Sequence, residues 1–96
     1  MAIRSFSRQA VADFYFDGKT ARREGWSQIA TIVTRKLDML NYAHKLDDLR
    51  SPPANRLEAL NGDWAGFHSV RVNDQWRLVF RWTEQGAESV DVVDYH

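Results

Sequence analysis

The segment from Asn55 to Trp82 constrains the fold of this chain more than any other. Within it, apolar side chains recur at every second position; they are Val70 and Val72, then Trp76, Leu78, Phe80 and Trp82. A period of two is typical of strands with one buried face. The polar pair Asn73-Asp74 separates the two runs and predicts a turn. The segment therefore predicts a β-hairpin whose apolar face lies against a core.

The length of the turn decides which residues of the hairpin face each other. A two-residue loop would set Val70 beside Arg77, and a slip of one residue turns every side chain to the other face. A three-residue loop over residues 73–75, with one residue in the left-handed region that Asn and Asp tolerate, sets Val70 opposite Leu78 instead. Arg71 then lies opposite Arg77. Like charges directly across a strand pair destabilise a sheet by about 0.2–1 kcal/mol, so we expect an anion beside these two arginines.

Two helices are predicted before the hairpin. The first begins after Ser7, a favourable N-cap, runs through Phe16 and is ended by Gly18. The second extends from Trp26 to about Leu49 and is ended by the two prolines that follow. Its apolar residues form one stripe, which we expect to lie on the apolar face of the sheet: Trp26, Ile29, Val33, Leu37, Leu40 and Ala43.

The remaining segments predict strands at residues 2–6, 56–60 and 89–96. The order β-α-α-β-β-β-β predicts an α+β fold in which two helices pack on one face of a mostly antiparallel sheet. We expect the opposite face to be open and to carry the polar strand residues Arg71, Arg77, Arg81 and Tyr95. Strict alternation places Tyr95 and His96 on opposite faces, so the two share a face only if the last residue bends around.

The composition predicts one compact domain spanning residues 1–96. The chain has 96 residues, of which 44% are hydrophobic, enough for a single core. It has no cysteine, and its three histidines lack metal-ligand spacing, so we expect neither a metal nor a cofactor. No apolar run approaches 18 residues, and the first residues, MAIRSFSRQ, lack the apolar core of a signal peptide. We therefore expect a cytoplasmic protein that does not bind membranes.

The formal net charge is zero, but the charges are unevenly distributed. Residues 1–36 contain seven basic and three acidic side chains, whereas residues 37–96 contain six basic and ten acidic ones. A nucleic acid would therefore meet local basic patches rather than a basic protein. One such patch is the predicted loop from Asp17 to Gly25, with Lys19, Arg22 and Arg23. These three residues fit either a solvated turn or a contact for phosphates.

Three motifs resemble the HigB branch of the RelE-type bacterial toxins: PPANRLEALNGDWAG, SVRVNDQWRLVFRW and VDVVDYH. The length and the order of elements agree as well, so the resemblance covers nearly the whole chain. It implies a ribosome-dependent endoribonuclease that cuts mRNA in the decoding site without a metal. It also implies a HigA-type helix-turn-helix antitoxin as partner, with operator DNA contacted only through that antitoxin.

The resemblance also implies the site residues. Metal-free cleavage needs a group that accepts the 2′-hydroxyl proton, a charge that stabilises the phosphorane and an acid for the leaving 5′-oxygen. Arg77 matches the family's phosphate-stabilising arginine, and Asp94, Tyr95 and His96 match its C-terminal catalytic motif. Glu58 stands where some members have a catalytic histidine, and is the candidate to replace that base.

Phosphate contacts are expected from Arg71 and Arg81 on the sheet and from the loop residues Lys19, Arg22 and Arg23. The rival hypothesis is a non-catalytic module on the same fold, which binds RNA or its antitoxin without cutting. Cleavage of mRNA on translating ribosomes would distinguish the two.

Overall fold

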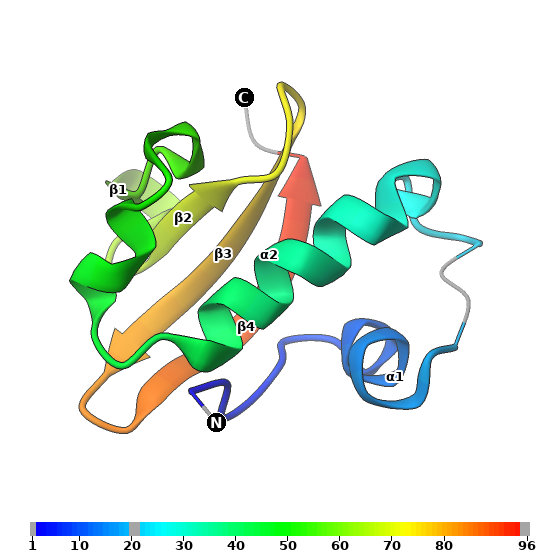
Figure 1. Cartoon of the computed structure of the whole chain (residues 1–96), viewed down its shortest axis with the longest axis horizontal. Coiled ribbons are helices and arrows are strands. Elements are labelled where there is room, and N and C mark those ends of the chain that lie inside the picture. Colours follow the sequence, from blue (N-terminus) through cyan, green and yellow to red (C-terminus); the bar gives the residue numbers. More distant parts are fainter. Residues whose placement is uncertain (1, 20–21, 95–96) are drawn as a thin grey trace.

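Across residues 2–19 and 22–94, which the computed structural model describes, the chain forms two helices and a four-stranded sheet (Figure 1). The helices are α1 (Gln9–Asp17) and α2 (Ala30–Tyr42), and the strands are β1 (Glu58–Ala59), β2 (His68–Arg71), β3 (Trp76–Thr83) and β4 (Gly86–Asp94). Short 3-10 turns lie between them: η1 (Ser27–Ile29), η2 (Leu46–Arg50), η3 (Pro53–Asn55) and η4 (Gly62–Trp64). The strands are antiparallel in the order β1-β2-β3-β4, which confirms the predicted α+β class.

One stripe of α2 is buried against the sheet, as predicted. Val33, Leu37 and Leu40 are fully buried and form one cluster with Leu78 and Phe80 of β3. Fully burying a side chain of this size contributes about 1.5–3 kcal/mol, whereas a typical hydrogen bond contributes about 0.5–1.5 kcal/mol net. The apolar contact between α2 and the sheet therefore dominates the stability of this layer.

The second predicted helix is shorter than expected. α2 ends at Tyr42, and the backbone of Ala43 is extended. Just beyond, the carboxylate of Asp48 accepts hydrogen bonds from the N–H groups of His44 (2.9 Å) and Lys45 (3.2 Å). These hydrogen bonds hold the pKa of Asp48 below its ordinary value, and the bond from His44 has the largest effect. A side chain that binds backbone N–H groups competes with the helix, so the chain leaves α2 and forms η2.

The start of α1 also differs from the prediction. The helix begins at Gln9 with Arg8 as N-cap residue, and no side chain caps it. Ser7, the predicted cap, donates its hydroxyl to the carbonyl of Ser89 instead (2.9 Å). The predicted end is confirmed, because Gly18 follows α1 with a φ of 67°, a left-handed conformation that glycine adopts without strain.

Residues 2–6, predicted as a strand, pair with β4 only in part. Two isolated parallel bridges join them to β4, at Ala87 and at Val90. Between these bridges Ser89 has a φ of 53°, and the register of β3 against β4 shifts there. A bulge of this kind bends a strand and interrupts its pairing. The first segment therefore lies beside β4 without forming a continuous strand.

The predicted register of the hairpin is confirmed. Val70 lies opposite Leu78, and Arg71 lies opposite Arg77. Val70 and Leu78 are buried in the cluster that includes the stripe of α2. Alternation then directs both arginines to the other face of the sheet.

The geometry of the turn itself was predicted wrongly. None of residues 73–75 has a positive φ. Instead, Asn73 Oδ1 accepts hydrogen bonds from the N–H groups of Gln75 (2.9 Å) and Trp76 (2.7 Å). An Asn side chain bonded to the backbone two residues ahead imitates a backbone turn, so the chain reverses without a left-handed residue.

The face that carries the arginines is less open than predicted. Ser69 and Val79, which alternate with the core residues of β2 and β3, are fully buried on that face. The side chain of Arg77 is 12% exposed. Side chains and neighbouring backbone therefore cover this face around Arg77.

Gly86, the first residue of β4, generates a stability prediction. It has a φ of 127°, and a Cβ there would overlap the carbonyl oxygen of Ala2. We expect Gly86→Ala to lower the free energy of unfolding by about 3 kcal/mol or more, since overpacking costs about 1–3 kcal/mol and an unfavourable φ adds about 1–3 kcal/mol. Urea and thermal unfolding measure the change.

Gly18→Ala is the matched control, because Gly18 also has a positive φ but no heavy atom lies within 4 Å of a Cβ there. It should cost only the conformational term, about 1–2 kcal/mol. Equal losses for the two variants would show that the close approach of Gly86 to Ala2 does not matter for stability.

Candidate active site

Arg77 of β3 lies at the centre of the candidate site. Its Nε donates a hydrogen bond to Ser69 Oγ of β2 (2.7 Å), and its Nη2 donates one to the carbonyl of Arg56 (2.8 Å). Ser69 is fully buried. Two bonds from one planar group to separate elements fix both its position and its plane, so the guanidinium is held in place before any ligand binds.

Glu58, the candidate general base, lies beside Arg77. The strand predicted over residues 56–60 is reduced to Glu58–Ala59, and Glu58 is paired with Ser69. Its carboxylate lies 3.9 Å from Arg77 Nη2, and its side chain is 53% exposed. The structure therefore brings an accessible carboxylate and a largely buried, hydrogen-bonded arginine together on one face of the sheet.

The carbonyl that binds Arg77 belongs to a residue in an unusual conformation. Arg56 has a φ of 46°, in the left-handed region, which costs a residue with a side chain about 1–2 kcal/mol. The preceding residue, Asn55, is fully buried, and its Nδ2 donates to the carbonyls of Leu49 (3.1 Å) and Ser51 (3.3 Å). Asn55 thereby fixes the segment, and Arg56 follows it in a conformation that the surroundings impose.

Lys36 of α2 is a nearby basic residue that the sequence did not indicate. Its Nζ donates to Asn55 Oδ1 (2.6 Å). Burial, followed by the positive charges of Arg35 and Arg71, lowers the pKa of Lys36. A lysine on the polar side of a helix gives no local signal of such a contact, since the partner lies 19 residues away in the chain.

The two opposed arginines have different partners within the chain. Arg71 forms an ion pair with Asp74 in the turn, while Arg77 faces Glu58. The anions expected beside them are therefore, at least in part, side chains of the protein itself. Arg71 remains a predicted phosphate contact.

Asp94 is placed differently from the other candidates. It lies opposite Trp76, whereas Val93 lies opposite Arg77. Its carboxylate accepts a hydrogen bond from Gln75 Nε2 (2.9 Å). The register thus sets Asp94 one residue out of phase with Arg77, and the structure does not show these two side chains on the same face. The other predicted members of this motif, Tyr95 and His96, lie outside the described residues.

Arg81 lies further along β3 and contacts an aromatic pair. Its guanidinium carbon lies 5.1 Å from the centre of the Phe67 ring, and Trp64 packs edge-on against the same ring (5.2 Å). Arg81 is exposed, and such a cation-π contact leaves its N–H groups accessible. Its predicted role in phosphate binding stays a prediction.

The basic loop residues lie away from this site. Lys19, Arg22 and Arg23 are exposed, and Figure 1 shows their loop beyond the β4 edge of the sheet, whereas β1 and β2 lie at the other edge. The structure therefore does not bring them to Arg77. Their exposure is compatible with both readings of the sequence, a solvated turn and a phosphate contact.

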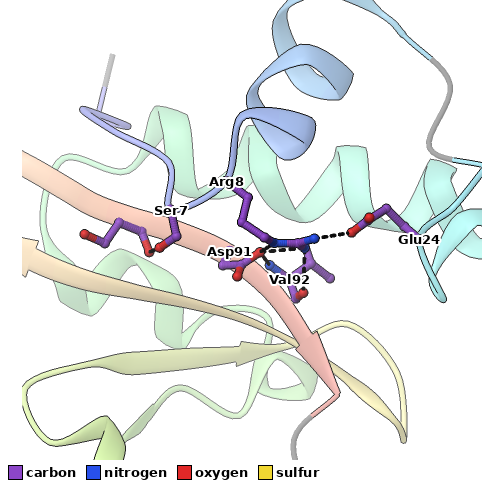
Figure 2. A network of polar contacts seen from close by, with 6 residues as sticks. Ser7, Arg8, Glu24, Asp91 and Val92 are labelled. Carbon is purple, nitrogen blue, oxygen red and sulfur yellow. Dashed lines mark hydrogen bonds and ion pairs between the residues drawn. The ribbon is translucent and has the colours of Figure 1, made fainter.

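A network of charged groups fastens this loop to β4 (Figure 2). Arg8 Nε and Nη2 donate to Asp91 Oδ1 (3.0 and 2.8 Å), and Arg8 Nη1 lies 2.8 Å from Glu24 Oε1. The pKa of Arg8 is raised, and the largest cause is its hydrogen bond to Asp91. Sequence reasoning missed the network, which links the start of α1, the end of the basic loop and the strand that leads to Asp94.

The described surface has a pocket of about 490 Å³, but it lies elsewhere. It opens between the C-terminal end of α2 and the β3–β4 turn, and its lining includes Tyr42, His44, Trp82 and Glu84. Among the predicted site residues that the structure describes, none lines it. The described residues also contain no cluster of three or more His, Asp or Glu suited to a metal ion, and within them no helix is long and apolar enough to cross a bilayer.

Two solved structures have the same arrangement of elements. A YafQ mutant from Escherichia coli matches with a TM-score of 0.62 at 18% identity, covering 96% of this chain and 90% of that chain. A chain of the YoeB-YefM complex from Staphylococcus aureus matches with a TM-score of 0.59 at 19% identity, covering 98% and 94%. At such identities the likeness shows that this chain and those two share a fold.

The sequence comparisons define the family. The model for the HigB-like toxins, RelE-like toxins of type II toxin-antitoxin systems, matches residues 4–96. Toxin HigB-1 of Vibrio cholerae serotype O1 is 42% identical over 79 residues, 82% of each chain. The chain therefore belongs to the HigB-like family of toxins of type II toxin-antitoxin systems, as the resemblance of its motifs predicted.

The network in Figure 2 generates a prediction about the loop. We expect Arg8→Gln to lower the free energy of unfolding by about 1 kcal/mol, the upper end for exposed ion pairs, and hence the melting temperature by about 4–8 °C. Because Glu24 loses its partner, trypsin should cut faster at Lys19, Arg22 and Arg23. Differential scanning fluorimetry and mass spectrometry of the limited digest measure both effects.

Arg50→Gln is the matched control for this prediction, because within the described part of the chain Arg50 pairs only with Asp47, and both side chains are largely exposed, at 69% and 70%. It should change neither the melting temperature nor the digestion of the loop. Identical behaviour of the two variants would mean that the Arg8 network does not restrain the loop.

Proposed function

We propose that this toxin is a ribosome-dependent endoribonuclease that cuts mRNA by attack of a 2′-hydroxyl on the adjacent phosphorus. Family membership supports a toxin that acts with a type II antitoxin. The observation that supports cleavage is the geometry of Arg77, whose guanidinium is held by Ser69 and Arg56 and has the carboxylate of Glu58 at 3.9 Å. An accessible carboxylate can accept the proton of the 2′-hydroxyl, and a fixed cation can stabilise the phosphorane. These are two of the three groups that the reaction needs.

In this proposal Arg77 stabilises the phosphorane. A guanidinium has five N–H donors, and within the described part of the chain the hydrogen bonds of Arg77 use Nε and Nη2. The donors on Nη1 are left for the phosphate oxygens as they gain negative charge. A donor that is already in place costs no reorganisation when the transition state forms.

Glu58 is the proposed general base, and the C-terminal residues supply the acid. The half-exposed carboxylate of Glu58 accepts the proton of the 2′-hydroxyl, and its distance of 3.9 Å from Arg77 Nη2 is short enough for both groups to contact one phosphodiester. A histidine ordinarily exchanges protons near neutral pH, whereas a tyrosine does so at about pH 10. We therefore assign proton donation to His96 and an orienting role to Tyr95, with Asp94 as a supporting member of the motif.

The ribosome is the proposed source of an oriented substrate. The net charge of zero provides little affinity for free RNA, and positioning the reacting groups accounts for much of such catalysis. Arg71 and Arg81 on the sheet and Lys19, Arg22 and Arg23 in the loop would contact RNA phosphates. This assignment places the toxin in the cytoplasm, with a HigA-type antitoxin as partner and operator DNA bound only through that antitoxin.

Cleavage assays on translating ribosomes test the proposed function. We expect purified toxin to cut a defined mRNA at discrete positions when ribosomes translate it, and to leave the same synthetic mRNA intact without ribosomes. Primer extension maps the ends. Ribosome binding without cuts would favour the non-catalytic module, and efficient digestion of free mRNA would contradict the dependence on ribosomes.

Arg77 generates the main prediction on activity. We expect Arg77→Ala to lower the single-turnover rate on ribosomes by roughly 100-fold or more, the scale for losing one transition-state donor. Arg77→Lys keeps the charge but cannot reproduce the two-point binding of the planar group, so it should recover only part of the rate. Wild-type cleavage by Arg77→Ala would exclude Arg77 from the site.

The C-terminal assignment generates a second prediction on activity. Deletion of His96 should remove most single-turnover cleavage while the melting temperature and antitoxin binding barely change, because a terminal residue buries little surface. Tyr95→Phe should lose less. Full activity of the deletion together with an inactive Tyr95→Phe variant would reverse the two roles.

A further inference from the structure

We propose that Ser69 is a positioning residue for Arg77: its buried hydroxyl holds the guanidinium in the plane from which it binds the transition state. The proposal rests on the proposed function and adds a residue to it that neither the resemblance nor the alternation of the sequence indicated. Ser69 touches no substrate in this account. It acts only through the arginine.

The burial of Ser69 is the first observation. Its relative exposure is 0%, and it lies in β2 between Glu58 of β1 and Val79 of β3. Burying a hydroxyl without a hydrogen bond is unfavourable, so a serine at this position requires a partner. Within the described residues its hydroxyl is bonded to Arg77 Nε at 2.7 Å. If position 69 served packing alone, alanine would fill it equally well, so the hydroxyl of Ser69 points to a role in binding Arg77.

The second observation is that Ser69 and Arg56 hold Arg77 from two separate elements. Ser69 Oγ binds Nε, and the carbonyl of Arg56 binds Nη2 at 2.8 Å. One bond would leave the group free to rotate about it, whereas two bonds to fixed points define its plane. Asn55 keeps the carbonyl in place, because this fully buried residue is bonded to the carbonyls of Leu49 and Ser51.

The consequence is an arginine that is ordered without its ligand. Side chains that hold a catalytic group in its productive geometry need locked rotamers and supporting hydrogen bonds. Both are present here, since Arg77 is 12% exposed and two of its nitrogens are bonded. Loss of the serine hydroxyl would leave the arginine charge in the site but allow it to move.

The test is Ser69→Ala in the full chain. We expect the maximal single-turnover rate of mRNA cleavage on ribosomes to fall roughly 10-fold, since small misplacements of a catalytic group are costly, while the ribosome concentration at half-maximal rate stays within about 2-fold. Alanine is smaller than serine, so the buried position accommodates it, and a thermal melt verifies the fold. Ser7→Ala removes a hydroxyl bonded to the carbonyl of Ser89 and should leave cleavage unchanged.

A double-mutant cycle separates positioning from a structural role. In an Arg77→Ala background, Ser69→Ala should cause no further loss, because the group that it positions is absent. An equal loss in both backgrounds would overturn the proposal, and so would full activity of Ser69→Ala in the presence of Arg77. Wild-type activity of Arg77→Ala would instead contradict the proposed function itself. The experiment therefore distinguishes a failure of the Ser69 proposal from a failure of the proposed function.

Discussion

The pairing of Val70 with Leu78 is the constraint on which the rest of the structure depends. A slip of one residue would turn the arginines of one strand toward the core, and the buried stripe of α2 would then meet charged side chains. The same register sets Arg71 opposite Arg77. Apolar burial of several kcal/mol outweighs the repulsion of two charges, about 0.2–1 kcal/mol, so the sheet keeps this register and the charges are compensated locally by Asp74 and Glu58.

The candidate site then follows from the way buried polar groups are satisfied. The guanidinium of Arg77 is largely buried and needs acceptors, and it finds them in the Ser69 hydroxyl and the Arg56 carbonyl. The left-handed conformation of Arg56 is unfavourable by itself. It persists because Asn55 is buried and bonded on several sides. The stability of the segment before β1 thus maintains the geometry of a group on β3.

Particular residues show how far the candidate site could be predicted. Arg77 emerged from the alternation and from the resemblance, whereas the ion pair between Arg77 and Glu58 is seen only in the structure. Asp94 was also implied, but its phase relative to Arg77 depends on how β4 pairs with β3. The contact of Arg81 with Phe67 depends on how β2 pairs with β3, because His68, the residue after Phe67, lies opposite Phe80, the residue before Arg81. Such placements are set by pairing between elements, which a local pattern does not encode.

The sequence by itself determined the fold class, the register of the hairpin, the buried stripe of α2 and the family, because periodicity and short motifs act over a few neighbouring residues. Tertiary structure decided where α2 ends, the bulge at Ser89 and the environment of the site. The bond from Lys36 to Asn55 spans 19 residues and that from Arg8 to Asp91 spans 83. Contacts at such separations depend on the packing of the apolar faces, since packing brings their partners within hydrogen-bonding distance.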